Sequence, residues 1–219
     1  MNRSAYISIA AVSITALISG YFLWLLVTDV SKVEGLGLSG IFLVTLLSHL
    51  TMVARDIFIP LFLSLTPLYH PLILGTAAGV GGAIGDVAPY VLGMGVAETV
   101  KSDGSKAEDL VSRWISKYGL WAILIVAATP LPDLPVVMLA GTRRLPFKKL
   151  LIIEAIGKTA LYSVGAFFGG WMFDLLIGAV GSLTASALIL LTSITFCILL
   201  TWPPSRDWLF KLLDRFITV

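Results

Sequence analysis

The sequence predicts an all-α polytopic membrane protein, built as an inverted-topology repeat with two opposed re-entrant hairpins and short amphipathic interfacial helices. Three observations lead to this fold class. The 219 residues are 58% hydrophobic and 13% charged, with a mean hydropathy of +0.96, whereas soluble domains carry about 25% charged residues. An eleven-residue stretch occurs twice. Finally, two apolar segments are interrupted by charged or proline-rich turns.

The repeated stretch begins at Ala83 and returns at Ala155, with six of eleven positions identical. Its fourth position is Asp86 in the first copy and Lys158 in the second. A charge at the centre of a membrane helix costs roughly 2.5–3.5 kcal/mol on insertion scales. Opposite charges at equivalent positions therefore predict a close pair near the midplane, across a pseudo-two-fold axis. A chance match in an Ala/Gly/Ile-rich background is the alternative.

We interpret residues 1–219 as a single integral membrane domain with five parts. In chain order these are a first transmembrane helix and loop (1–37), repeat 1 with a hairpin and a helix (38–96), a cytoplasmic amphipathic linker (97–118), repeat 2 with a hairpin and a helix (119–170), and a last transmembrane helix with a C-terminal amphipathic helix (171–219).

The first two parts follow from the apolar runs. Residues 5–28 are long enough to span a bilayer, and no small-residue cleavage site follows, which favours an uncleaved helix. In repeat 1, Arg55-Asp56 interrupts two short apolar arms. The run 71–96 follows, with glycines at three- and four-residue spacing, a pattern that lets membrane helices approach closely.

The remaining parts carry more polar signals. A capping box at Ser105–Glu108 predicts a surface helix within the linker. In repeat 2, Thr129–Pro135 breaks an apolar run, and 147–170 then continues as a helix. The last apolar run, about 176–201, ends at Pro203-Pro204, before the C-terminal amphipathic helix.

The arms of both interrupted segments are too short to cross a bilayer. Residues 118–129 make about 18 Å of helix, against a hydrocarbon core of about 30 Å. Three prolines within 130–135 exclude a continuous helix. Such backbone is tolerated at membrane depth only where protein or a wet cavity surrounds it. Both segments are therefore predicted to enter and leave by the same side.

The distribution of Lys and Arg supports these hairpins. With both termini cytoplasmic and both segments re-entrant, twelve of the thirteen basic residues other than Arg55 and Lys158 lie inside. Two full spans would change the ratio from twelve to one to eight to five. Because basic residues concentrate on the cytoplasmic side, the hairpin topology is favoured. It makes the two repeats run in opposite directions, an architecture whose substrate sites lie near the midplane.

The motif residues resemble a known family. Gly82-Ala83-Ile84-Gly85-Asp86, followed by Tyr90 and Gly93, is similar to the signature of the DedA family, also called the VTT-domain or SNARE-associated Golgi protein family. Ala140-Gly141, Phe147 and Gly157 resemble its second half, so the likeness covers roughly residues 38–170. The resemblance implies lipid translocation: bacterial-type members move undecaprenyl phosphate, and eukaryotic relatives scramble phospholipids.

This sequence departs from the bacterial pattern in its charges. The family resemblance implies glutamates in the first hairpin and an arginine in the second. Here the first hairpin carries Arg55 and Asp56, and the second carries Asp133. The charges of the hairpins are thus roughly exchanged, and the roles of individual residues stay open.

The candidate substrate-binding or coupling residues are charges inside or beside apolar runs: Arg55, Asp56, Asp86, Asp133, Glu154, Lys158, Arg143 and Arg144.

Each candidate also has a structural interpretation. Arg55-Asp56 is either a local interfacial pair or a hairpin apex whose guanidinium binds an anionic headgroup. Asp133 either caps a turn or takes up a proton, because burial disfavours a charged carboxylate.

On the long helices, Glu154 and Lys158 have the spacing of an intrahelical pair, which competes with the predicted Asp86–Lys158 contact. Arg143 and Arg144 are expected to be topology determinants, with a secondary role in attracting phosphate headgroups.

Several function classes are not supported by the sequence. It offers no set of catalytic residues, no metal-ligand cluster and no cofactor loop, so we do not expect an enzyme. No basic block suggests a nucleic-acid partner, and the single cysteine, Cys197, excludes a disulfide framework. The oligomeric state stays open.

The leading functional expectation is a lipid transporter, either a flippase or a scramblase, in the prokaryotic plasma membrane. Its partner would be a membrane lipid with an anionic phosphate headgroup, and a polyprenyl phosphate carrier is one candidate. A proton-coupled secondary transporter of a small ion or solute is the first alternative. A non-transporting membrane scaffold, whose charges pair only internally, is the second.

The topology can be tested with single cysteines. Ser105→Cys and Pro146→Cys, each in a Cys197→Ala background, are expected to react with a membrane-impermeant thiol reagent only from the cytoplasmic side. Labelling from opposite sides would mean that the second hairpin spans the membrane and that the repeat is not inverted.

Overall fold

The computed structural model describes residues 3–28, 35–97, 119–130 and 133–181, with 183–185, 187, 188, 191, 192 and 195. All regular structure within these residues is helical, as the sequence predicts. The predicted linker helix and the C-terminal amphipathic helix lie outside the described residues. Of the predicted last transmembrane helix, only residues 176–181 and the short pieces after them are described.

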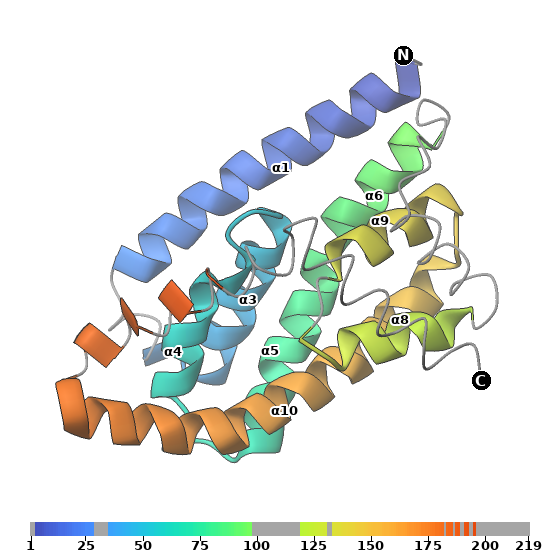
Figure 1. Cartoon of the computed structure of the whole chain (residues 1–219). Helices are drawn as coiled ribbons and strands as arrows, with labels where there is room; N and C mark the ends of the chain where they lie inside the picture. The colour runs from blue at the N-terminus through green and yellow to red at the C-terminus, as the bar shows by residue number, and fades with distance from the viewer. Residues whose placement is uncertain are drawn as a thin grey trace.

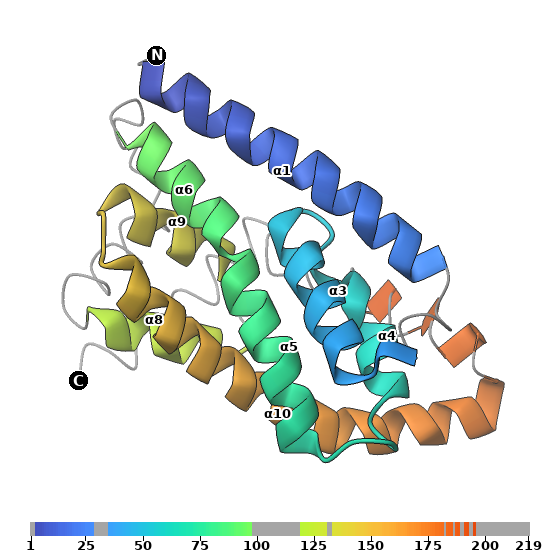
Figure 2. The ribbon, with the colours of Figure 1, turned by 180° about the vertical axis from the view of Figure 1, so that it is seen from behind.

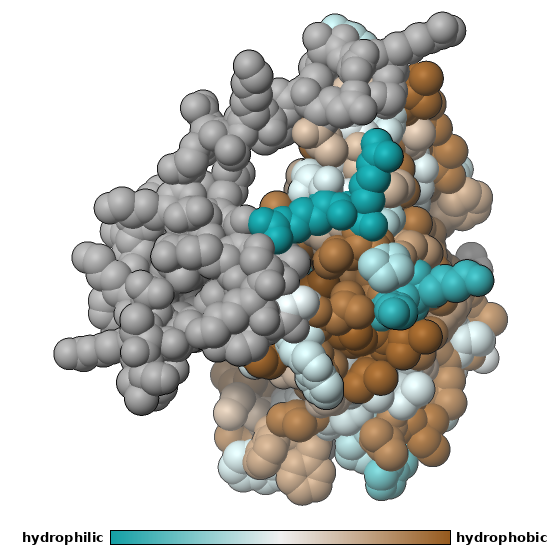
Figure 3. All heavy atoms as spheres, turned by 90° about the vertical axis from the view of Figure 1, so that its right-hand side faces the viewer, coloured by the Kyte–Doolittle hydropathy of each residue, from teal (hydrophilic) through white to brown (hydrophobic). Residues whose placement is uncertain are grey.

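Among the described residues, three stretches are long and apolar enough to cross a membrane: Ala5–Leu26, Pro71–Val96 and Phe147–Val180. They correspond to α1 (Arg3–Thr28), to α5 (Pro71–Gly85) with α6 (Val87–Val96), and to α10 (Phe147–Val180). Their outer faces carry large exposed hydrophobic side chains, such as Leu17 on α1 and Trp171 on α10. Figure 3 shows one face of the molecule, where hydrophobic residues predominate over a few hydrophilic side chains. Such a surface suits lipid, so this is a membrane protein.

Shorter helices lie between these stretches. The first group is α3 (Leu38–Leu50), the 3₁₀ helix η1 (Arg55–Phe58) and α4 (Ile59–Ser64), and the second is α8 (Leu120–Ala127) with α9 (Leu134–Thr142). The interruptions therefore fall at Arg55 and before Leu134, where the sequence predicts them. At 1.5 Å per residue, α3 is about 20 Å long and the others are shorter, so none of them alone matches a hydrocarbon core of about 30 Å.

The short helices pack around two long ones. Figures 1 and 2 show α5 and α6 arranged end to end, with α10 crossing α5 and α1 lying along α6 and α3. Helix α3 packs on α5 and α8 packs on α10, whereas α9 packs on α6 and α4 on α10. Each long element thus contacts one helix from each group of short helices.

The predicted run over residues 71–96 is not one continuous helix. Helix α5 ends at Gly85, α6 begins at Val87, and Asp86 joins them. Pro89 explains this junction, since its ring clashes with the carbonyl four residues earlier, at Gly85, and it has no N–H to donate. The break places the Asp86 side chain between two helices rather than within a regular turn.

The helix of the second repeat is longer than the sequence analysis expected. We placed its end at residue 170, because Trp171 and Asp174 follow, but α10 continues to Val180. Neither residue breaks a helix, and the next glycine that ends one is Gly181, whose φ is +83°. At 34 residues, α10 is about 51 Å long and exceeds the thickness of a hydrocarbon core.

Helices α5 and α10 approach so closely that side chains are excluded from their crossing. A Cβ atom at Gly79 would lie 2.5 Å from the backbone nitrogen of Thr159, and one at Gly75 would lie 2.5 Å from that of Ser163. Small residues commonly permit such contacts between membrane helices. Just beyond this crossing, Asp86 of the first copy of the repeated stretch lies next to Lys158 of the second.

The crossing can be tested by adding a methyl group. Gly79→Ala is expected to destabilise the protein by about 1–3 kcal/mol, because the Thr159 backbone must move. Gly165→Ala is the matched control, since nothing lies within 4 Å of its Cβ position. It should be neutral or stabilising by up to about 1 kcal/mol. Thermal unfolding in detergent measures both variants, and equal melting temperatures would contradict the close crossing.

Candidate functional site

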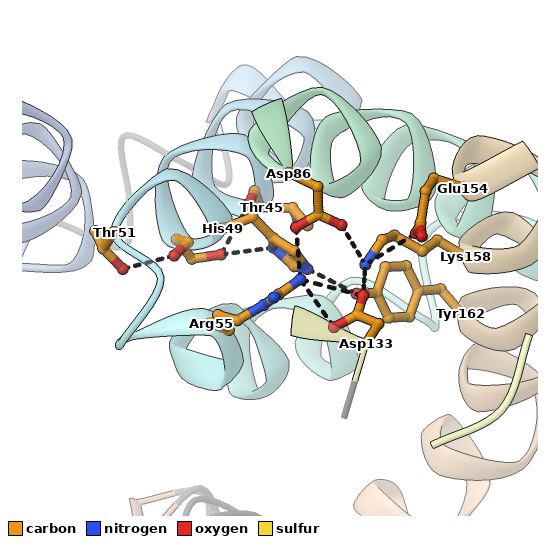
Figure 4. Close-up of polar contacts among 10 residues, drawn as sticks. Thr45, His49, Thr51, Arg55, Asp86, Asp133, Glu154, Lys158 and Tyr162 are labelled. Carbon is orange, nitrogen blue, oxygen red and sulfur yellow. Dashed lines mark hydrogen bonds and ion pairs between the residues drawn. The ribbon is translucent and has the colours of Figure 1, made fainter. Parts of the chain in front are cut away.

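Four charged side chains of alternating sign form a closed ring inside the helix bundle (Figure 4). Arg55 Nη2 lies 2.6 Å from Asp86 Oδ1 and 3.1 Å from Asp133 Oδ1. Lys158 Nζ lies 2.9 Å from Asp86 Oδ2 and donates a hydrogen bond to Asp133 Oδ2. Each aspartate therefore bridges both cations. We call these four residues the charge ring.

The ring assembles at points where the helices break. Arg55 begins η1, Asp133 precedes α9, and Asp86 occupies the junction between α5 and α6. Lys158 is the exception, because it projects from the continuous helix α10. Residues 38–96 and 119–170, the two predicted repeats, thus each contribute one cation and one anion.

Glu154 adds a fifth charge beside the ring. Its Oε2 lies 3.7 Å from Lys158 Nζ, one helical turn away. Both carboxylate oxygens of Glu154 are buried, and neither accepts a hydrogen bond from any residue that the structure describes. Buried Arg55 Nη1 likewise has no hydrogen-bond partner among the described residues. With all groups ionised, the cluster holds three carboxylates and two cations.

Because positive and negative side chains alternate around the ring, this cluster can be accommodated in an apolar interior. An isolated buried charge is strongly unfavourable, whereas a pair with good geometry offsets much of its desolvation cost. Asp86 and Lys158 are each only 3% exposed, while Arg55 and Asp133 are 13% and 15% exposed. The ring thus has a buried half on the long helices and a more accessible half at the turns.

A second layer of hydrogen bonds includes residues that the sequence analysis missed. His49 Nδ1 donates to the Thr45 carbonyl at 2.9 Å, which leaves Nε2 to accept from the Tyr162 hydroxyl at 3.2 Å. Tyr162 lies one turn after Lys158, and the aromatic ring of Phe58 packs on it with centroids 5.2 Å apart. The sequence did hold one signal for Tyr162, which is its place among the identical positions of the repeated stretch.

The equivalent tyrosine of the first copy also anchors its helix. The Tyr90 hydroxyl donates to the Leu145 carbonyl at 2.6 Å and ties α6 to the segment between α9 and α10. Tyr162 in turn ties α10 to His49 on α3. Each tyrosine therefore connects its own predicted repeat to the other one.

The predicted proximity of Asp86 and Lys158 is confirmed, and it is closer than the Glu154–Lys158 contact. Asp133 does not cap a turn with its side chain. Its carboxylate contacts Arg55 and Lys158 instead.

The other candidates lie outside the ring. Asp56 is half-buried in η1 and is not a ring member. Arg143 and Arg144 are exposed at the far end of α9 from Asp133. Arg144 also has a φ of +50°.

The structure brings together carboxylates that the sequence analysis did not group. Ligand atoms of Asp86, Asp133 and Glu154 lie within 4.8 Å of one another, a spacing that suits a metal ion. The Lys158 ammonium already lies among these three carboxylates, at 2.9 Å from Asp86 and 3.7 Å from Glu154. A metal ion would have to displace this ammonium, so the residues present do not form a preorganised metal site.

The family model of the VTT domain matches residues 57–169, which is more than half of the chain. No curated protein and no solved structure gives a significant match. The matched segment contains Asp86, Asp133, Glu154 and Lys158 and begins two residues after Arg55.

The ring changes what a charge exchange should do. From the sequence alone, Asp86→Lys combined with Lys158→Asp is expected to restore a broken pair. In the ring, the exchange puts a lysine at position 86, where the native carboxylate lies 2.6 Å from Arg55, and it puts a second carboxylate beside Asp133. We now expect the double exchange to be no more stable than Lys158→Ala, which itself should cost about 3–5 kcal/mol.

Folded yield by size exclusion and thermal unfolding measure this outcome. Asp86→Ala is expected to cost less than Lys158→Ala, because it leaves two carboxylates opposite two cations. Full recovery of folded yield in the double exchange would show that Asp86 and Lys158 form an isolated pair and not part of a ring.

Proposed function

The chain belongs to the VTT domain family, and from this membership and the charge ring we propose that it is a lipid transporter rather than an enzyme. We propose a flippase or scramblase for a phosphate-bearing lipid, with a polyprenyl phosphate carrier as one candidate. The observation that carries the proposal is the charge ring within an otherwise apolar helix bundle. A headgroup that crosses a bilayer needs a polar site at depth, because the hydrocarbon offers none.

We propose that α3–α4 and α8–α9 are re-entrant hairpins of an inverted repeat. Their short arms support this, because none of these helices is long enough to span. The packing supports it as well: the first arm of each hairpin contacts the long helix of its own repeat, and the second arm contacts that of the other repeat. Asp86 and Lys158, which are equivalent in sequence, then meet near the pseudo-two-fold axis.

The proposed topology places both termini on the cytoplasmic side of a plasma membrane, which we propose to be prokaryotic. The basic residues then concentrate on the cytoplasmic side. Arg143 and Arg144, together with Lys148 and Lys149, form an exposed basic group near the start of α10. Such a group attracts anionic headgroups by about 1 kcal/mol for each basic residue near the membrane surface.

Within the ring, Arg55 and Lys158 are the proposed phosphate-binding residues. Arginine is always charged and presents several donors in a plane, which suits phosphate oxygens. Arg55 Nη1 has no hydrogen-bond partner and is available to such a ligand. Lysine supplies a second, more compact charge. A lipid bound in this way keeps its headgroup at the ring while its chains stay in the bilayer.

One observation favours a second function, proton-coupled transport of a small ion or solute. Glu154 is buried, and neither of its oxygens accepts a hydrogen bond. Because the cluster holds three carboxylates and only two cations, Glu154 can take up and release a proton. Solute uptake driven by a proton gradient would distinguish this function from lipid transport.

Reconstitution into liposomes tests the proposed function. Fluorescent polyprenyl phosphate or phospholipid in one leaflet should become accessible to an aqueous quencher several-fold faster with the protein than without it. Arg55→Gln should lower this rate at least about tenfold, which corresponds to about 1.4 kcal/mol of lost transition-state binding. Arg144→Gln removes the same charge from the exposed basic group outside the ring, and it should lower the rate by less, because it loses only the surface attraction of about 1 kcal/mol. Equal rates in protein-containing and empty liposomes would refute lipid transport.

A further inference from the structure

The two aspartates of the ring bind the same two cations but are held very differently. Asp86 lies at the α5–α6 junction, and its side chain is 3% exposed. Around it, α5 packs on α3 and α10, while α6 packs on α1 and α9. Asp86 therefore cannot leave the ring without separating the central helices.

Asp133 is held by much less structure. Its side chain is 15% exposed, five times the fraction of Asp86. It stands directly before α9, a helix of nine residues. Its backbone carbonyl accepts from Val137 at 2.9 Å, but its side chain makes no capping hydrogen bond. The contacts of its carboxylate with Arg55 and Lys158 thus hold the start of α9 against the ring.

The position of the Asp133 carboxylate is that of a bridging anion. Both of its oxygens lie 3.1 Å from Arg55 Nη2, and one also accepts from Lys158 Nζ. A phosphate group presents oxygens to an arginine and a lysine in the same manner. Exchange of one anion for another would leave the alternation of signs in the ring intact.

We propose that Asp133 is a resident substitute for the headgroup phosphate, and that the incoming phosphate displaces Asp133 and not Asp86 from Arg55 and Lys158. This inference rests on the proposed recognition of a phosphate headgroup. Displacement frees the start of α9 from the ring, so α8 and α9 are the helices that move. Asp86 stays in place and keeps both cations positioned for the ligand.

Binding measurements on three isosteric variants test the identity of the displaced anion. Asp133→Asn, Asp86→Asn and Glu154→Gln each remove one negative charge, so general electrostatic attraction should rise in all three. Only Asp133→Asn also removes the carboxylate that is proposed to compete with the phosphate for Arg55 and Lys158. The full-length protein in maltoside detergent is titrated calorimetrically with dodecyl phosphate and, separately, with inorganic phosphate.

Asp133→Asn is expected to bind dodecyl phosphate at least about tenfold more tightly than either of the other two variants, a difference of about 1.4 kcal/mol. Similar affinities in all three variants, or the tightest binding by Asp86→Asn, would overturn the proposal. Tighter binding of inorganic phosphate as well would identify the phosphate group itself as the ligand. A response to dodecyl phosphate alone would identify a lipid headgroup.

A second measurement leaves the ring unaltered and does not depend on the folding of these variants. Val137→Cys on α9 and Val44→Cys on α3 replace two valines that are both 0% exposed, each in a Cys197→Ala background. Dodecyl phosphate should accelerate thiol modification of the cysteine at 137 several-fold and leave the one at 44 unchanged. Acceleration at 44 instead, or at neither position, would overturn the proposal.

These outcomes are separable from the proposed function. Acceleration at position 137 without any lipid movement in liposomes would refute lipid transport and leave the displacement of Asp133 standing. Lipid movement that depends on Arg55, with no selective effect of Asp133→Asn and no acceleration at 137, would support lipid transport and refute the displacement of Asp133.

Discussion

The ring of alternating charges is the constraint on which the rest of this structure depends. Arg55, Asp86, Asp133 and Lys158 come from parts of the chain up to 103 residues apart, and each needs two of the others. Loss of either cation leaves three buried carboxylates opposite a single positive charge. The helix breaks at Arg55, Asp86 and Asp133 place three of these side chains where they can meet Lys158.

Close packing of small residues makes the ring geometrically possible. Lys158 reaches the ring past Gly82, where a Cβ would lie 3.3 Å from Lys158 Cδ and 3.2 Å from the imidazole of His49. Gly79 also lets the α5 and α10 backbones approach closely, so the side chain of Lys158 is long enough to reach Asp86. The apolar packing and the polar site thus depend on the same glycines.

The exchanged charges of this chain fit the same architecture. An ion pair needs one charge of each sign, and it does not matter which segment supplies the cation. Arg55 at the first interruption and Asp133 at the second keep the alternation with Asp86 and Lys158. What changes is the sign of the more exposed side chain opposite Lys158: it is an anion, which we propose that an anionic headgroup replaces.

The sequence by itself determined the helical membrane fold and the two interruptions, and it narrowed the partner of Lys158 to Asp86 or Glu154. These follow from local signals: apolar length, proline, and the cost of a charge in an apolar run. Only the tertiary structure decided that Asp133 and Arg55 close the pair into a ring, that Asp56 stays outside, and that His49 supports Tyr162. Those contacts depend on how separate helices cross, and a local pattern does not encode that geometry.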